Sequence, residues 1–332
     1  MSLPSDMSKN EKFSAITLHE STSDLTSTVK ISPHLSFHHV FPYKIGPNWV
    51  NWLGTLHSTE ILKADMVLLA TLPSSKPGIL DDENEKVIST VTKLLYSLFV
   101  VGVPGYSRLN LLTGGIIEGE PEVRQVSKMP TFYAVSGERA LRVDKSDAEE
   151  AGRIFKTLDQ IYTVPKGYDA LRRGFKIFLK AIAERLHYDR VHQFVRSLEA
   201  IILAERGRTQ KQFQHRCQTF SIPSSDTYNT LGTLYEFRSR VEHLQDWDEL
   251  LGGGAQTELE ESANYRCRQV EALARHTYRK ILTTPSILKH FETPATLEHF
   301  WKNCKDDDRI KIWGEQFNLA SVPIHPPNPY TL

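Results

Sequence analysis

The sequence predicts an α+β domain followed by an all-α antiparallel helical bundle. Apolar residues recur at helical spacing from residue 146 to residue 283, whereas residues 31–145 combine one strand-like run, one helical run and a stretch rich in Gly and Pro. Apolar positions three and four residues apart indicate one buried face of a helix, and Gly and Pro clusters indicate turns between strands. The chain of 332 residues, 40% of them hydrophobic, is long enough for two hydrophobic cores.

The first 30 residues are poor in core-forming side chains, because eleven of them are Ser or Thr. Two short runs, KFSAITL and TSTVKIS, show some of the alternation that is typical of strands. We therefore expect residues 1–30 to form a flexible N-terminus with one or two edge strands.

Residues 31–145 are expected to form an α+β domain of their own. MVLLATL, at 66–72, predicts a buried strand, and GVPGYSRLNLLTGGIIEGEPEVRQVSKMP, at 102–130, predicts short strands and turns, with a hairpin at TGGIIEGEPE. No motif in this domain indicates its role. A helix is predicted by apolar residues at helical spacing, namely Val87, Val91, Leu94, Leu95 and Leu98.

Residues 146–283 predict six helices in an antiparallel bundle. Ser146 and Glu149 have the spacing of a capping box at the start of the first helix. The glycines of DELLGGGAQ are expected to form the loop before the last helix, and the Pro-punctuated residues 284–332 an extended C-terminal tail. The clearest helix has one apolar face, made by Val191, Phe194, Val195, Leu198, Ile201 and Ile202.

The formal net charge is zero, so no global field attracts nucleic acid. A local excess of positive charge exists between Lys166 and Arg216, a segment with twelve Lys or Arg and five Asp or Glu. Two interpretations are open for it: a ridge that contacts an RNA backbone, or the solvated face of an amphipathic helix. The basic residues at helical spacing are Arg172, Arg173, Lys176 and Lys180.

The sequence predicts a cytoplasmic protein without a metal ion or cofactor. Its three cysteines lack the spacing of a metal site or redox pair, and His34, His38 and His39 have no carboxylate or cysteine at ligand spacing. No leader-like segment opens the chain, and the longest apolar run, LLYSLFVVGV, is about half as long as a membrane span.

LYEFRSRVEHLQDW, at 234–247, places Arg238 on the apolar stripe of a helix that also buries Leu231 and Leu234. A guanidinium at such a position needs a partner or a cleft. His243 diverges from Arg238 by about 140° on a straight helix. The two side chains can therefore meet only if the helix ends near His243 or if a second copy of the chain completes the site. The alternative is structural, an i,i+4 pair of Arg238 with Glu242.

The order of these motifs resembles the HEPN superfamily, specifically its Apea-like branch, over residues 146–283. In that branch a Leu-Glu pair on an early helix precedes a Tyr-x-x-Arg-x-x-x-x-His stretch. The matching residues here are Leu198, Glu199, Tyr235, Arg238 and His243.

The resemblance implies a metal-independent endoribonuclease that acts as a homodimer on RNA, in stress response or phage defence, with Arg and His lining a shared cleft. His243 would transfer protons and Arg238 would stabilise phosphate charge, supported by Glu199, Tyr235 and Ser239. Ser239 occupies a position where active members often carry Asn, Asp or His. The alternative is therefore a non-catalytic bundle that binds RNA or a nucleotide, or that scaffolds a partner. Glu199 is expected to pair with Arg238 or with Arg196.

Overall fold

The computed structural model describes residues 10–19, 23–103, 108–117, 120–130, 132, 142–253 and 255–324. The chain divides into two compact units. Residues 1–132 and 140–159 belong to the first, called here the sheet unit, and residues 133–139 and 160–332 to the second, called the helical unit. An α+β N-terminal part and a mostly helical C-terminal part are therefore present, as the sequence predicts.

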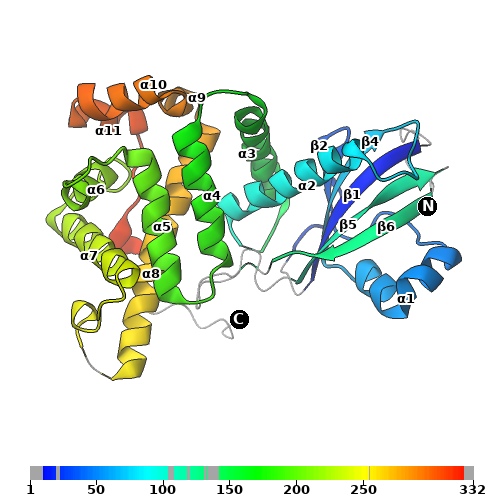
Figure 1. Ribbon diagram of the computed structural model, residues 1–332, viewed down its shortest axis with the longest axis horizontal. Helices are drawn as coiled ribbons and strands as arrows, with labels where there is room; N and C mark the ends of the chain where they lie inside the picture. The colour runs from blue at the N-terminus through cyan, green and yellow to red at the C-terminus, as the bar shows by residue number, and fades with distance from the viewer. Residues whose placement is uncertain are drawn as a thin grey trace. The chain divides into compact units, whose positions relative to one another are not determined.

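The sheet unit contains a six-stranded antiparallel sheet with the strand order β2-β3-β4-β1-β5-β6 (Figure 1). Ala15 of β1 lies opposite Leu69 of β4 on one side and opposite Leu112 of β5 on the other. The predicted strand at 66–72 and the predicted hairpin are confirmed as β4 and as the pair β5 and β6. The strands are β1 (Asn10–His19), β2 (Val29–Ser32), β3 (Leu35–His38), β4 (Met66–Pro73), β5 (Arg108–Ile117) and β6 (Glu120–Lys128).

The prediction of a flexible or edge-strand N-terminus over 1–30 is wrong for residues 10–19, because β1 is a central strand with nearly every side chain buried. Its polar residues find partners inside the protein. The Lys12 ammonium is fully buried, donates to the Ile79 carbonyl at 2.8 Å and forms an ion pair with Asp81. A buried ammonium is tolerated only when it is paired in this way.

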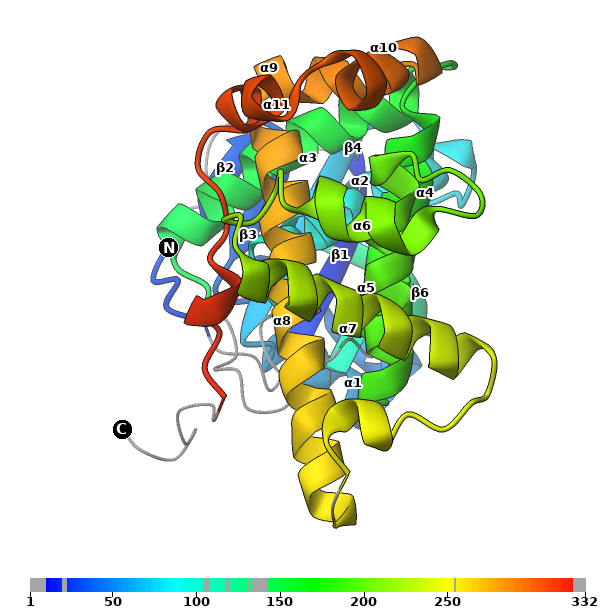
Figure 2. The same ribbon diagram turned by 90° about the vertical axis from the view of Figure 1, so that its left-hand side faces the viewer.

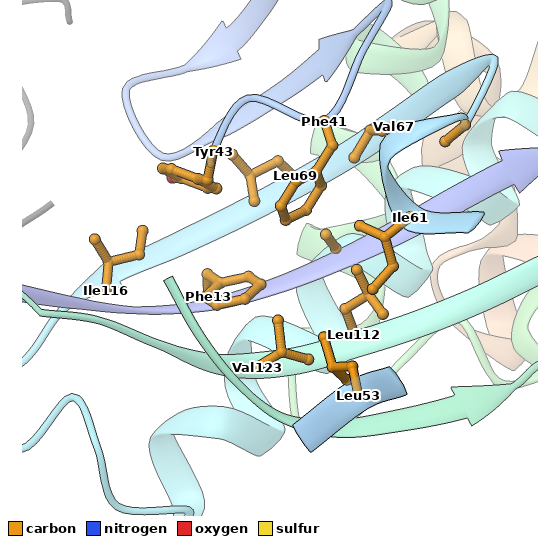
Figure 3. Packing of buried hydrophobic residues seen from close by; sticks show 12 residues of the cluster. Phe13, Phe41, Tyr43, Leu53, Ile61, Val67, Leu69, Leu112, Ile116 and Val123 are labelled. Carbon is orange, nitrogen blue, oxygen red and sulfur yellow. The ribbon is translucent and has the colours of Figure 1, made fainter. Parts of the chain in front are cut away.

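Helices α1 (Pro47–Leu62) and α2 (Asp82–Val101) pack on opposite faces of the sheet. The α1 face carries an apolar cluster in which Leu53 and Ile61 of α1 meet side chains of β1, β4 and β5 (Figure 3). Helix α2, which confirms the predicted helix, begins at a capping box of Asp81 and Asn84. The cluster consists of Phe13, Ala15, Phe41, Tyr43, Leu53, Ile61, Ala64, Val67, Leu69, Leu112, Ile116 and Val123.

Helix α3 (Lys145–Thr163) corrects the predicted domain boundary at residue 146, because residues up to 159 belong to the sheet unit. Lys93 of α2 forms an ion pair with Asp159 at 2.7 Å, and Gly152 lies so close to Ile31 that an added Cβ would be 2.6 Å from its Cδ1. The predicted Ser146–Glu149 capping box is also replaced. Residues 144 and 147, both Asp, exchange backbone-to-side-chain hydrogen bonds of 2.9 and 3.1 Å at the start of the helix.

The helical unit is built around helix α5, which contacts α4, α6, α7 and α8. Helices α4 and α8 both pack against α5, and α7 crosses α5 (Figures 1 and 2). The five helices confirm the remaining helices predicted for the bundle. They are α4 (Asp169–Ala183), α5 (His187–Ile202), α6 (Thr209–Cys217), α7 (Ser225–Glu242) and α8 (Gln256–Thr283).

Two polar contacts fix α5 against its neighbours. The Ser197 hydroxyl donates to the Gly174 carbonyl of α4 at 2.9 Å, and the Tyr278 hydroxyl of α8 donates to the Ser197 carbonyl at 3.0 Å. Further along α5, Arg190 pairs with Glu271 of α8 at 2.5 Å, with both side chains at most 2% exposed. These contacts set the register of α4 and α8 along α5.

The predicted extended tail over 284–332 is wrong for residues 285–313, which are mostly short helices, and residues 325–332 lie outside the described part of the chain. Pro285 and Pro294 start helices instead of breaking them, because the first helical residue needs no N–H donor. Trp301 and Trp313 are buried, and the Trp301 indole donates to the Ile201 carbonyl of α5 at 2.8 Å. These elements are α9 (Pro285–Leu288), α10 (Pro294–Glu298), a π-helical turn (His299–Asn303) and α11 (Asp306–Trp313).

Replacing Gly174 with alanine tests the close packing of α4 on α5. A Cβ there would lie 2.3 Å from the Tyr278 hydroxyl and 2.9 Å from the Ser197 carbonyl oxygen, so the helices must separate. We expect Gly174→Ala to lower the free energy of unfolding by about 2 kcal/mol, measured by urea denaturation. Gly46→Ala is the matched control, since its Cβ would meet no atom closer than 3.9 Å. Equal stability of the two variants would contradict this packing.

Candidate functional site

Helix α7 begins at a serine cap and ends at His243. The Ser224 hydroxyl accepts a hydrogen bond of 3.0 Å from a backbone N–H of the first turn. At the other end the His243 N–H donates to the Ser239 carbonyl at 3.1 Å, and Leu244 then adopts a left-handed φ of 54°. Because the helix stops there, one of the two conditions for His243 to approach Arg238 is met.

Arg238 forms ion pairs with two carboxylates. Its Nη2 lies 3.2 Å from Glu199 Oε2 of α5, and its Nη1 binds Glu242, one turn further along α7. The guanidinium also lies over the Tyr235 ring, with 5.8 Å between its Cζ and the ring centroid. The structure thus contains both the Arg238–Glu199 pair and the i,i+4 pair expected from the sequence.

The pair between α5 and α7 is largely removed from water, because the Arg238 and Glu199 side chains are each 15% exposed. Burial raises the pKa of the Glu199 carboxyl, and the positive charge of Arg238 opposes this shift. The Arg238 Nε is buried and has no hydrogen-bond acceptor among the described residues. Nη1 and Nη2 of Arg238 thus contact carboxylates, whereas its Nε–H remains an unused donor.

His192 lies near this pair and was not singled out by the sequence. Burial lowers the pKa of its imidazole, and the charges of Arg238 and Arg196 lower it further, so the ring is neutral at neutral pH. Its Nε2 is buried without a hydrogen-bond partner in the described part of the chain. The available signal was spacing, since His192 precedes Glu199 by seven residues and so shares a face of α5 with it.

The His243 side chain is exposed, and it makes no hydrogen bond or ion pair with any residue that the structure describes. Ser239, one turn earlier, is half-buried. The structure thus brings Glu199, Tyr235 and Arg238 together, and it places the His243 imidazole at the same end of α7 without a bond to the guanidinium.

The four basic residues predicted on α4 differ in their environments. Arg172 donates to the carbonyls of Ile161 at 3.0 Å and Val164 at 2.5 Å, so it caps the end of α3. The other three are exposed and recur at helical spacing, so they line one solvated face of α4. They are Arg173, Lys176 and Lys180.

A basic cleft of about 850 Å³ lies at the start of α6, and sequence reasoning did not identify it. Arg208 and Lys211 are exposed on its rim. Arg216 and Arg309 are buried at 8% and 5% exposure and approach the Trp301 ring, with Cζ-to-centroid distances of 5.6 and 5.5 Å. Arg309 is paired with Asp306, and Arg216 donates to the carbonyls of Ile202 and Leu203. The charge that the cleft can offer to an anion therefore comes from the exposed Arg208 and Lys211.

The basic cleft adjoins the Arg238 site through one residue. Thr209 lines the cleft and lies close to Tyr235, whose ring underlies Arg238. Burial and the charge of Glu199 raise the pKa of the Tyr235 hydroxyl, and the nearby Thr209 side chain opposes this shift. The signal in the sequence was the run ERGRTQK, at 205–211, but its concave arrangement depends on Trp301 and Arg309, which come about 100 residues later. Periodicity along one helix cannot reveal such a surface.

Comparison of the chain with protein-family models, curated proteins and solved structures finds no match. Within the described ranges, no helix is both long and apolar enough to cross a membrane. In the same ranges no three His, Cys, Asp or Glu side chains gather in a way that could hold a metal ion. The chemistry of the site must be inferred from its geometry.

Replacing His192 tests its burial next to Arg238. Because its pKa is lowered in the folded state, the unfolded chain binds a proton more readily below about pH 6.5. His192 therefore reduces stability as the pH falls from that value towards the folded pKa. We expect His192→Gln to reduce the loss of unfolding free energy between about pH 7.5 and about pH 5, measured by urea denaturation. A loss as large as that of the unmodified protein would contradict this burial.

Proposed function

We propose that the helical unit is a HEPN-type endoribonuclease that binds RNA in the basic cleft and cleaves it, without a metal ion, at the end of α7. The observation that supports this proposal is the basic cleft at the start of α6, whose lining residue Thr209 lies close to Tyr235, the ring beneath Arg238. An RNA backbone bound in the cleft would therefore continue towards the Arg238 guanidinium and the exposed His243 imidazole. We further propose that the protein acts as a homodimer in the cytoplasm, in stress response or phage defence.

The chemistry needs two proton transfers. The ribose 2′-oxygen forms a bond to the adjacent phosphorus while the bond from phosphorus to the 5′-oxygen breaks. One imidazole accepts the proton of the 2′-hydroxyl, and an acid donates a proton to the leaving 5′-oxygen. In a dimer these groups would be His243 and His243 of the partner subunit. The products would be a 2′,3′-cyclic phosphate and a 5′-hydroxyl.

Arg238 would stabilise the charge that develops on the phosphate. Its two carboxylate partners differ in their environments. Glu199 is 15% exposed and packed between helices, whereas the Glu242 side chain is 38% exposed at the end of α7. A phosphate would displace Glu242, which can return to water at low cost, while Glu199 keeps the guanidinium in position. Glu199 is thus a positioning residue.

A non-catalytic bundle that binds RNA or a nucleotide, or that scaffolds a partner, is the second candidate. Two observations favour it: both carboxylates already neutralise Arg238, and Ser239 occupies a position where active HEPN proteins often carry Asn, Asp or His. In this alternative the basic cleft binds RNA, and the end of α7 has only a structural role.

Replacing His243 tests catalysis most cleanly, because the imidazole is exposed and its loss leaves no buried group unpaired. We expect His243→Ala to slow cleavage of a single-stranded RNA by roughly 10²-fold or more. Cleavage by the unmodified protein should persist in EDTA and yield 2′,3′-cyclic phosphate ends, detected by phosphatase-resistant mobility on gels.

The control is His57→Ala, which removes a half-exposed imidazole of the sheet unit and should leave the rate unchanged. Sedimentation at micromolar concentration should give a dimer for the unmodified protein and for both variants. A dimer that is stable at this concentration is expected to bury about 1,200 Å² or more. If His243→Ala cleaves as fast as the unmodified protein, or if the latter binds RNA without cleaving it, the binding alternative replaces catalysis.

Charge reversal at the rim tests the basic cleft independently of catalysis. We expect Arg208→Glu and Lys211→Glu together to weaken RNA binding and to reduce the slope of log affinity against log salt by roughly 1 to 2. Lys63→Glu, an exposed change in the sheet unit, is the matched control and should alter neither. Fluorescence anisotropy with a labelled RNA at several salt concentrations gives both values. An unchanged slope would remove the cleft from the RNA path.

A further inference from the structure

A cavity of about 700 Å³ lies in the sheet unit, on the face of the sheet that also carries the apolar cluster. Strands β1, β2, β3 and β4 form its floor, and the segment with Pro42 and Tyr43 covers part of it. Its size is that of small-molecule sites in proteins. The apolar walls include Ile31, Pro33, Pro42 and Leu69.

Glu11 of β1 supplies a carboxylate to this floor. Alternation along the strand places Glu11 on the same face as Phe13 and Ala15, which belong to the apolar cluster. The Glu11 side chain is 4% exposed, and the basic group nearest to it among the described residues is the His34 ring, whose Nδ1 lies 3.9 Å away, beyond hydrogen-bonding distance. His34 is instead within 3.3 Å of the Thr71 hydroxyl. The contact with His34 is the only ion pair of Glu11 in the described part of the chain. The negative charge of the buried Glu11 carboxylate is therefore poorly compensated.

Tyr43 adds a second polar group without a partner. It is 6% exposed, and its hydroxyl oxygen is buried without a hydrogen bond to any described residue. Burial raises the pKa of this hydroxyl, and the negative charge of Glu11 raises it further, so the group remains a neutral donor and acceptor. Figure 3 shows Tyr43 on the same side of the cluster as Ile116, away from Leu53.

Among the other polar lining residues, Lys30 is exposed to solvent and His38 is hydrogen-bonded to its neighbours. His38 Nε2 lies 2.8 Å from the Ser36 hydroxyl and its Nδ1 3.0 Å from the Thr28 hydroxyl. Burial, with His39 and Lys30, lowers the pKa of His38 to about 4, so the ring is neutral. The buried polar groups of the cavity that lack a hydrogen-bonded partner among the described residues are therefore the carboxylate of Glu11 and the hydroxyl of Tyr43.

We propose that this cavity binds a small molecule through a protonated amino group, with Glu11 as the counter-ion and the Tyr43 oxygen as a second acceptor. An ammonium group supplies the charge and the donors that a buried carboxylate needs. The apolar walls would hold an aliphatic or aromatic body. This site is independent of the function proposed for the helical unit.

The test titrates the full-length protein with butylammonium chloride, and with butan-1-ol and sodium butanoate as neutral and anionic probes of equal chain length. Nuclear magnetic resonance of the labelled protein should show butylammonium shifting amide signals of residues that line the cavity. The other two probes should leave these signals unchanged. Equal effects of all three probes, or shifts outside the cavity only, would overturn the proposal.

Two variants sharpen the test. Glu11→Gln keeps the shape of the side chain but removes its charge, and should weaken butylammonium binding by about 10-fold or more. Tyr43→Phe removes a hydroxyl that has no partner, so the protein should stay folded while the affinity falls a few-fold. Glu120→Gln, an exposed carboxylate of the same unit, is the control with unchanged binding. Unaltered affinity in Tyr43→Phe or in folded Glu11→Gln would refute this site.

Discussion

Each buried charge on helix α5 requires a partner on a neighbouring helix, and this constraint organises the helical unit. Arg190 meets Glu271 of α8, and Glu271 also binds Arg275, so the carboxylate lies between two guanidinium groups at 1% exposure. Glu199 meets Arg238 of α7. Breaking a buried pair costs about 3–5 kcal/mol, whereas an exposed pair contributes about 0–1 kcal/mol. The buried pairs therefore determine where α7 and α8 lie along α5, and the pair of Arg238 with the more exposed Glu242 does not.

This difference in burial explains how a structural arginine could also take part in chemistry. In the proposed mechanism the Glu199 contact keeps Arg238 in position, and release of the more exposed Glu242 would free part of the guanidinium for a phosphate. The sheet unit contains a buried carboxylate in a different situation. Glu11 has no cation at hydrogen-bonding distance, so its charge is not neutralised by a neighbouring side chain. A buried carboxylate with two arginines holds helices together, whereas one without a bonded cation indicates a place for a ligand.

The spacing of apolar residues in the sequence predicted those helices that bury one apolar face. The apolar stripes of α2 and α5 were visible in the sequence, as was the position of Arg238 on the buried face of α7. The central place of β1 was not, because Lys12 and Ser14 read as polar surface until the partners of Lys12 near residue 81 are known. Pro285 and Pro294 suggested an extended tail, because a proline that breaks a helix and one that begins a helix look alike in the sequence. His192 and the basic cleft depend on contacts between helices, which periodicity does not contain.

The most direct measurement is a crystal structure of the protein with a single-stranded RNA that carries a 2′-deoxy nucleotide and so cannot be cleaved at that position. The proposed mechanism predicts a phosphate within hydrogen-bonding distance of Arg238, displacement of Glu242, the His243 imidazole next to the 2′ position, and the flanking phosphates in the cleft beside Arg208 and Lys211. RNA bound elsewhere, or bound in the cleft with the Arg238–Glu242 pair intact and His243 remote from the sugar, would contradict it.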